Sequence, residues 1–197
     1  MIQFRMLTML LLTLFGCEST NPYTLQVEGP GLSVSPSLET LADLAPGEVA
    51  EVSFNLDNTG AREGNLSVEF IEYTGVGLSA DLSEIPDVLV PGERIEVVVT
   101  YAPEGPGVAI GYIQATVLGA DECGEAWAVV RANAVDDSCD PDDLDCDGQT
   151  ATSGDCDDDE PFNGIALPEI CDGKDNNCDG TADPDCRAGQ CGHPPPP

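Results

Sequence analysis

The stretch Val90–Tyr101, with the sequence VPGERIEVVVTY, decides the fold class of this chain. It opens with a Pro-Gly pair, which is typical of a tight turn. The residues that follow alternate between apolar and polar types, and the apolar members are Ile95, Val97, Val99 and Tyr101. Alternation with a period of two predicts a β-strand that buries one face and exposes the other.

The combination of a turn and an alternating run occurs again on both sides of this stretch. Upstream, the turn APGE at 45–48 leads into a run whose apolar members are Val52, Phe54 and Leu56. Further strands are expected at Leu66–Ile71, at Ile113, Ala115 and Val117, and at Trp127 and Val129, with Trp127 in the core. No segment has a convincing helical pattern. The spacing predicts a mainly β protein, with an immunoglobulin-like β-sandwich of about seven strands over residues 30–135.

A family resemblance rests on these turns. The two Pro-Gly-Glu turns, together with Leu56–Gly60 and Thr100–Pro103, resemble the immunoglobulin-like domains of the ASPM/SPD-2/Hydin and major-sperm-protein type. The resemblance covers residues 30–135. It implies a protein-interaction or spacer domain with no catalytic residues, so a protein partner would bind through the β-sandwich.

The charge of the chain limits its partners. The 37 acidic and 6 basic side chains give a formal net charge of −31. Such a charge repels phosphates, so we expect no nucleic acid partner and no binding to anionic membrane surfaces. Because the hydrophobic fraction is 41% and the acidic residues concentrate toward the C-terminus, we expect a folded core rather than a disordered chain.

The N-terminal residues 1–16 have the pattern of a signal peptide. Arg5 supplies a positive charge, and Met6–Phe15 is an apolar run interrupted only by threonines. This run is too short to span a bilayer but fits the apolar region of a secretory signal. Leu14–Cys17 resembles a bacterial lipobox. The alternative is an ordinary secretory signal with a chance cysteine.

The lipobox resemblance implies that Cys17 is lipidated and anchors the protein to a membrane. Residues 17–29 are then a tether. The residue after the anchor is Glu18, which in the lipoprotein class favours the outer membrane, on its periplasmic or cell-surface face. Export delivers the chain to an oxidising compartment, so the eight of nine cysteines other than Cys17 can form disulfides. Their spacing does not select a connectivity.

The composition changes after Val135, where aliphatic alternation stops. Asp, Cys, Gly and Asn dominate residues 136–186, and a tail at 187–197 ends in four prolines. We interpret 136–186 as a small, loop-rich, disulfide-stapled module and the tail as extended or disordered chain.

The module contains two copies of half of a calcium loop. In the first, positions one, three and five hold Asp143, Asp145 and Asp147, and Gly148 holds position six. Alternate carboxylates on a sharply turned chain converge on one point, and Ca²⁺ requires six to eight oxygen ligands. The glycine permits the turn that points the carbonyl of Gln149 inward.

Neither copy has the usual glutamate at position twelve. In the first, we expect Asp155, Asp157 or Asp158 to complete the ligand set. The second copy begins at Asp175 and has glycine at 180. Its candidate ligands are Asp175, Asn177, Asp179, Thr181 and Asp183. A cysteine occupies position four of both copies, so the module contains an internal repeat.

A second resemblance rests on these residues. The segment from Asp155 to Asp158 and the segment PEICDGKDNNCDGTAD at 168–183 are similar to MopE-type metal-binding repeats, over about residues 145–184. The resemblance implies a secreted or surface-attached metal-binding module. The ligands it implies are Asp155, Asp157, Asp158, Asp172, Asp175, Asn177, Asp179 and Asp183.

The donor types favour calcium over the softer metals. Copper prefers Cys, Met and His, yet all three methionines lie in the signal segment and the single histidine is His193 in the tail. Zinc sites use Cys/His tetrads with short spacings that are absent here. We also find no motif for nucleophilic catalysis in the sequence, so we expect no enzymatic activity.

The sequence therefore predicts a non-enzymatic outer-membrane or surface lipoprotein with a structural calcium-binding module, acting as an interaction or spacer protein. A short module with few aliphatic residues needs disulfides and metal for stability. Two alternatives remain. One is a surface protein for acquiring or sensing a metal such as copper, and the other is a structural spacer without metal.

Overall fold

The computed structural model describes residues 31–75, 77–118, 124–135, 139–165, 167–170 and 172–183. The predicted signal peptide, the predicted lipidation site Cys17, the predicted tether and the proline tail lie outside these residues. Within the described part of the chain, no helix is long and apolar enough to cross a membrane.

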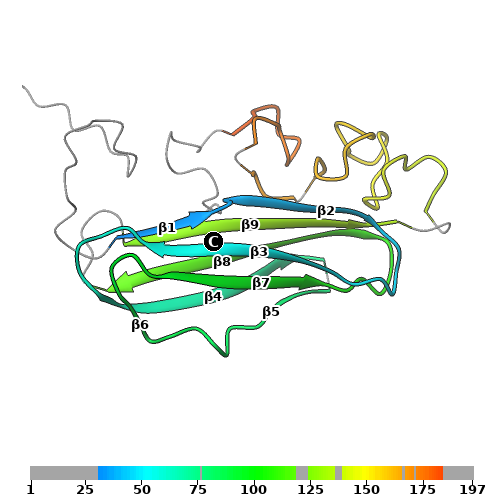
Figure 1. The fold of residues 1–197 in the computed structure, drawn as a ribbon. Helices are drawn as coiled ribbons and strands as arrows, with labels where there is room; N and C mark the ends of the chain where they lie inside the picture. Colours follow the sequence, from blue (N-terminus) through cyan, green and yellow to red (C-terminus); the bar gives the residue numbers. More distant parts are fainter. Residues whose placement is uncertain are drawn as a thin grey trace, which may run out of the picture.

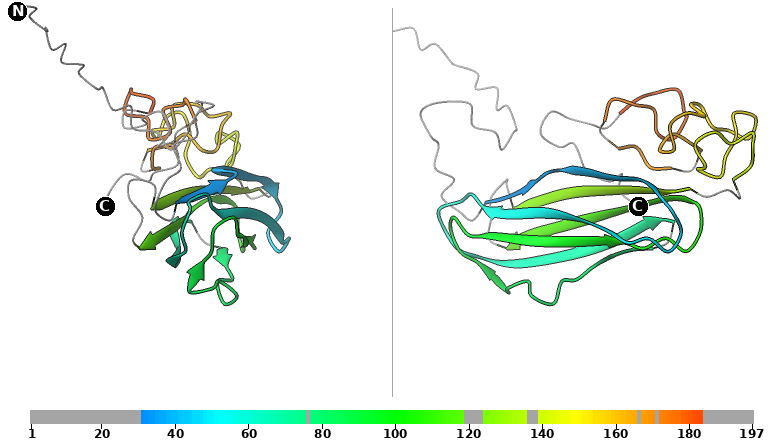
Figure 2. Two further views of the ribbon diagram at one scale, coloured as in Figure 1. Left: turned by 60° about the vertical axis from the view of Figure 1, so that its left-hand side comes forward. Right: turned by 45° about the vertical axis from the view of Figure 1, so that its right-hand side comes forward.

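The described residues form a sandwich of two β-sheets (Figures 1 and 2). Sheet A consists, in spatial order, of β1 (Leu32–Ser35), β3 (Ala50–Asn58), β7 (Arg94–Tyr101) and β5 (Leu78–Ala80). Sheet B consists, in spatial order, of β2 (Leu38–Leu44), β9 (Glu125–Ala134), β8 (Gly107–Leu118), β4 (Gly64–Thr74) and β6 (Val88–Leu89). The predicted immunoglobulin-like sandwich is confirmed, with nine described strands rather than about seven.

The alternation in β3 and β7 defines the core side of sheet A. Phe54 and Leu56 of β3, with Val97 and Val99 of β7, are fully buried, and the two strands pair antiparallel. Side chains of β8 and β9 fill the opposite side of the core, including Ile113, Ala115, Val117, Ala128 and Val130. Burial of these apolar faces is the main stabilising contribution to the sandwich.

The two Pro-Gly-Glu turns have the same hydrogen bonds. In the first, the Glu48 amide donates to the Ala45 carbonyl (3.0 Å) and the Glu48 carboxylate accepts from the Ala45 amide (2.9 Å). In the second, Glu93 and Val90 make the equivalent pair at 3.1 and 2.8 Å. The glycine of each turn has a positive φ, as a type II turn requires. These turns lead into β3 and β7, as predicted.

The prediction for β9 is wrong in one respect. Trp127 and Val129 do not face the sandwich core, because the residues that do are Ala126, Ala128 and Val130. Trp127 and Val129 lie on the other face of sheet B, which we call the outer face. Both faces of β9 carry apolar residues, so alternation alone cannot say which face points inward.

Residues 139–183, which we call the C-terminal module, pack on the outer face of sheet B. Ile170 of the module is buried against Ile110, Tyr112 and Val129, and Leu167 and Trp127 are packed at the edge of the same cluster. In Figures 1 and 2 the yellow-to-orange loops of the module lie on one side of the sandwich, next to β2 and β9. The module therefore provides a second hydrophobic core together with the sandwich.

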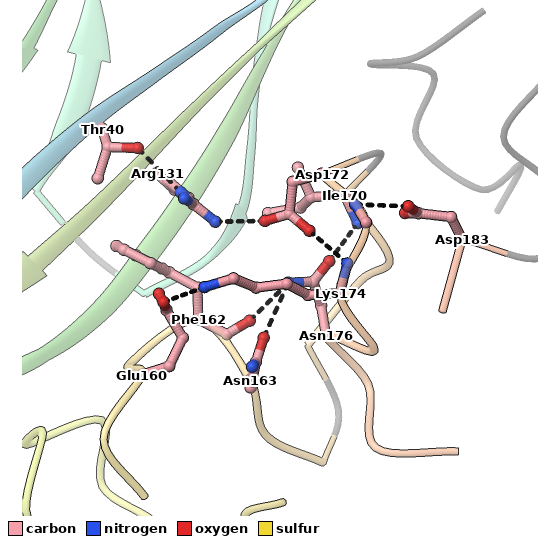
Figure 3. A network of polar contacts seen from close by, with 11 residues as sticks. Thr40, Arg131, Glu160, Phe162, Asn163, Ile170, Asp172, Lys174, Asn176 and Asp183 are labelled. Carbon is pink, nitrogen blue, oxygen red and sulfur yellow. Dashed lines mark hydrogen bonds and ion pairs between the residues drawn. The ribbon is translucent and has the colours of Figure 1, made fainter. Parts of the chain in front are cut away.

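Arg131 of β9 joins the sandwich to the module (Figure 3). Its guanidinium donates to Asp172 at 2.7 Å and to Thr40 of β2 at 2.9 Å, and it lies 4.5 Å from the centre of the Phe162 ring. The Arg131 and Asp172 side chains are only 13% and 9% exposed. This ion pair is largely removed from water, so it cannot lose one partner without leaving a poorly solvated charge.

Hydrogen bonds and disulfides hold the described part of the module in place of helices and strands. Asn176 is fully buried, and its amide donates to the Phe162 carbonyl and to Asn163 while accepting from the Ile170 amide (Figure 3). The sequence left the disulfide connectivity open. The structure pairs Cys139 with Cys146, and Cys156 with Cys178.

Candidate metal centre

The first loop has the backbone that its sequence predicts. Amides inside the loop donate to its own carboxylates: Gly148 to Asp143 (3.0 Å), Asp147 to Asp145 (3.1 Å) and Gln149 to Asp147 (2.6 Å). Cys146 at position four and Gly148 at position six have φ of 62° and 92°. These two left-handed residues turn the chain so sharply that all three carboxylates face the same side.

The three carboxylates converge on one point. One oxygen each from Asp143, Asp145 and Asp147 lies within 4.8 Å of the other two. Oxygens on opposite sides of one Ca²⁺ are separated by about 5 Å, twice the usual metal–oxygen distance. The spacing therefore fits three ligands of a single ion.

Six buried oxygens in this region accept no hydrogen bond from any described residue. They belong to Asp143, Asp145, Asp147, Gln149, Asp155 and Asp158. Asp143 and Asp155 are only 7% and 6% exposed. Buried polar atoms normally have a partner, because leaving one without costs about 1–3 kcal/mol. Six such oxygens along residues 143–158 are therefore available to hold a cation.

The residues that complete this set come partly from outside the loop. The sequence offered Asp155, Asp157 or Asp158, and the structure places Asp155 and Asp158 near enough to Asp147 to raise its pKa. Asp157 is exposed, and its amide donates to Asp155 at 2.8 Å. Gln149 was expected to contribute its carbonyl, and the structure also directs its side-chain oxygen into the buried region.

Gly164 provides space for these side chains. A Cβ at this position would lie 2.9 Å from the Asp147 carboxylate and would overlap the Gln149 amide. Beside the loop, a hollow of about 260 Å³ is lined in part by Gly107, Asp143 and Asp147. The loop therefore borders a hollow that it shares with the start of β8.

The second loop has the same backbone but a different environment. Cys178 and Gly180 have φ of 59° and 94°, close to the values in the first loop. Both oxygens of Asp175 accept amide hydrogen bonds, from Asp179 and Gly180, and the Asn177 oxygen accepts from the Asp179 amide. Asp179 is exposed, and among the described residues this loop has no buried oxygen without a partner.

The remaining predicted ligands lie apart from the first loop. The Asp172 carboxylate pairs with Arg131 and accepts the Lys174 amide. The Asp183 carboxylate accepts the Gly173 amide at 2.6 Å, and the exposed Thr181 donates its amide to Asp179 at 2.9 Å. The structure thus brings Asp143, Asp145 and Asp147 together and leaves these side chains outside that group.

The close carboxylates raise one another's pKa. Burial is the largest cause of the raised pKa of Asp145, which reaches about 7, and Asp147, Asp155 and Asp143 add to it. Burial also raises the pKa of Asp147 to about 6, with contributions from Asp155, Asp143 and Asp158. The pKa of Asp155 is raised by burial and by Asp158. A divalent cation would relieve this repulsion.

These raised pKa values predict how the metal-free protein responds to pH. The unfolded chain loses these protons near pH 3.8, whereas the folded module keeps them until about pH 6 or 7. The protonated forms of Asp145 and Asp147 contribute stability that is complete below the unfolded pKa of 3.8. This stability is lost as pH rises through the folded pKa values. We therefore expect the unfolding temperature of calcium-depleted protein to fall between about pH 4 and about pH 7.

Millimolar calcium should remove or reverse this fall, because the ion binds the deprotonated carboxylates. Thermal unfolding of protein treated with a chelating resin, with and without added calcium, measures both profiles. The Asp147→Asn variant serves as the control, and its metal-free profile should be flatter. A metal-free profile that rises with pH over this range would contradict the assignment.

Sequence reasoning missed several residues that support the site. Asn133 of β9 donates its amide to the Asp145 carbonyl at 3.1 Å, and Asn176 donates to the segment that precedes Gly164. Arg131 fixes the module on the sheet. The one available signal was the apolar character of both faces of β8 and β9, which indicates that something covers the outer face of sheet B.

Comparisons with known proteins found structural neighbours of low sequence identity. No protein-family model matches the chain, and no curated protein shows significant sequence similarity to it. The ASH/PapD-like domain 7 of human CEP192 is similar in structure, with 13% identity, a TM-score of 0.43, and coverage of 62% of this chain and 97% of that one. At these identities and TM-scores, the likeness concerns the β-sandwich alone.

Two bacterial proteins are also among the structural neighbours. A conjugative transposon lipoprotein from Bacteroides eggerthii shares 14% identity, with a TM-score of 0.38, over 52% of this chain and 97% of that chain. The secreted serine protease VesC from Vibrio cholerae shares 19% identity, with a TM-score of 0.42, over 57% of this chain. The match covers only 24% of the protease.

Proposed function

We propose that this protein is a non-enzymatic envelope lipoprotein whose C-terminal module binds a structural Ca²⁺ at the first loop. The observation that carries the proposal is the group of six buried oxygens without hydrogen-bond partners. They come from five carboxylates and one amide, which are the hard donors that calcium prefers. Calcium takes six to eight oxygens, so the three converging carboxylates would be joined by the remaining three residues or by water.

The ion would supply charge neutralisation and cross-linking. Asp143, Asp145 and Asp147 belong to the loop, whereas Asp155 and Asp158 come from a later segment. An ion between them would tie the two segments together, and binding free energy would become folding free energy. This role suits a module that has no helix or strand among its described residues.

The chemistry of the described residues argues against copper or zinc. The four described cysteines are paired in disulfides, so they offer no thiolates. The only histidine in the chain is His193. Metal acquisition or sensing by copper is therefore the weaker candidate, and a metal-free spacer leaves the buried oxygens unexplained.

The proposed location rests on the sequence and on the disulfides. Two disulfides among the described residues favour an oxidising compartment outside the cytoplasm. The lipobox resemblance at Leu14–Cys17 adds a membrane anchor. In this arrangement the sandwich extends from the membrane as an interaction or spacer domain and carries the calcium module on the outer face of sheet B.

Calcium titration of the metal-depleted protein tests the proposal. We expect isothermal titration to show one high-affinity calcium site, and saturating calcium to raise the unfolding temperature of the module by about 10 °C or more. Magnesium should bind more weakly, because the site offers many protein oxygens rather than water. Submicromolar copper binding without a calcium response would favour the acquisition role, and no response to either ion would favour the spacer.

A further inference from the structure

Strand β9 touches the proposed calcium loop directly. Asn133 lies on the outer face of sheet B and is 1% exposed. Its side-chain amide donates to the main-chain carbonyl of Asp145 at 3.1 Å. Arg131, two residues earlier on the same face, holds Asp172 at the other part of the module. Strand β9 therefore contacts the module at two places, Asp145 in the first loop and Asp172 before the second loop.

The hydrogen bond from Asn133 acts at a sensitive point of the loop. The Asp145 carbonyl belongs to the peptide that joins Asp145 to Cys146, the residue with φ of 62°. Fixing that carbonyl fixes the peptide plane between the second carboxylate and the left-handed turn. A change in the two backbone dihedrals that flank this peptide would move Asp147 relative to Asp143 and Asp145.

We propose that Asn133 is a positioning residue for the calcium site, through which the β-sandwich holds the loop in its binding conformation. This inference rests on the calcium site proposed above. It makes the module and the sandwich parts of one binding unit rather than two independent domains. By thermodynamic linkage, calcium must then strengthen the Asn133 contact as much as the contact strengthens calcium binding.

The full-length mature chain allows a direct test with the Asn133→Ala variant. Isothermal titration should show calcium binding about fivefold weaker, which corresponds to the loss of one hydrogen bond. The Asn133→Ser variant keeps a shorter donor and fills more of the space than alanine does. Its calcium affinity should therefore lie between those of wild type and Asn133→Ala. The matched control is Asn55→Ala on sheet A, because Asn55 also donates to a main-chain carbonyl, that of Ser35.

A second measurement separates positioning from a purely structural role. Thermal unfolding can be followed by the fluorescence of Trp127, the only tryptophan, which is packed beside the docking contacts of the module. If Asn133 positions the loop, Asn133→Ala loses more stability with calcium than without it. Equal losses in the two conditions, or an affinity within twofold of wild type, would overturn the inference. Wild-type protein that binds no calcium would instead overturn the proposed function.

Discussion

Replacing Asp147 by asparagine should lower the calcium affinity of the protein roughly 100-fold. Asp147 contributes one of the converging oxygens and accepts the Gln149 amide, so it both binds the ion and shapes the loop. The substitution keeps the size of the side chain and removes one negative charge next to the cation. Isothermal titration with calcium measures the effect.

Two controls make this result specific. Asp159→Asn removes an equal charge from an exposed position one residue after Asp158, and it should leave the affinity unchanged. Asp179→Asn makes the corresponding change in the second loop. Because the second loop has no buried oxygen without a partner among the described residues, Asp179→Asn should retain the high-affinity site. An equal loss of calcium affinity in Asp147→Asn and Asp179→Asn would contradict the assignment of the site to the first loop.

Replacing Arg131 by methionine should weaken the docking of the module by about 3–5 kcal/mol. The substitution keeps an apolar side chain against Phe162 but leaves the Asp172 carboxylate without its cation. It also removes the hydrogen bond to Thr40. Hydrogen exchange of residues 139–183 should become faster, and Trp127 should become more accessible to quenchers, while the sandwich stays folded.

The exposed ion pair of Arg94 and Asp57 gives the matched control. It joins β7 to β3 at 2.8 Å, and the Arg94 side chain is 62% exposed. Water already solvates this arginine, so Arg94→Met should have little effect on stability. The double variant Arg131→Met, Asp172→Asn should recover part of the loss, because it removes the unpaired carboxylate. A module as well protected in Arg131→Met as in wild type would contradict the role assigned to Arg131.

The sequence was sufficient for the parts of the fold that depend on local pattern. Alternation located β3 and β7 with the correct inward face, because one face of each strand is apolar and the other is mostly polar. It failed for β9, where Trp127 and Val130 are both large and apolar but lie on opposite faces. The missing information was the module itself, which packs on the face that a free sandwich would expose.

For the site, the sequence located the loop but could not choose all of its ligands. The spacing of Asp143, Asp145, Asp147 and Gly148 is a local property, so the loop could be recognised directly. The choice of Asp155 and Asp158 over Asp157 depends on how a later segment folds back. The contact from Asn133 depends on a residue that precedes the first loop residue by ten positions and belongs to no metal-binding motif.

The two loops also show how a repeated sequence can specialise. The disulfide from Cys178 joins the second loop to Cys156, directly after the buried Asp155. The second copy thereby restrains the backbone next to Asp155, which is a candidate ligand at the first copy. A motif search would count two equivalent ion sites. The disulfide suggests instead that the first copy holds the ion and that the second copy stabilises its conformation.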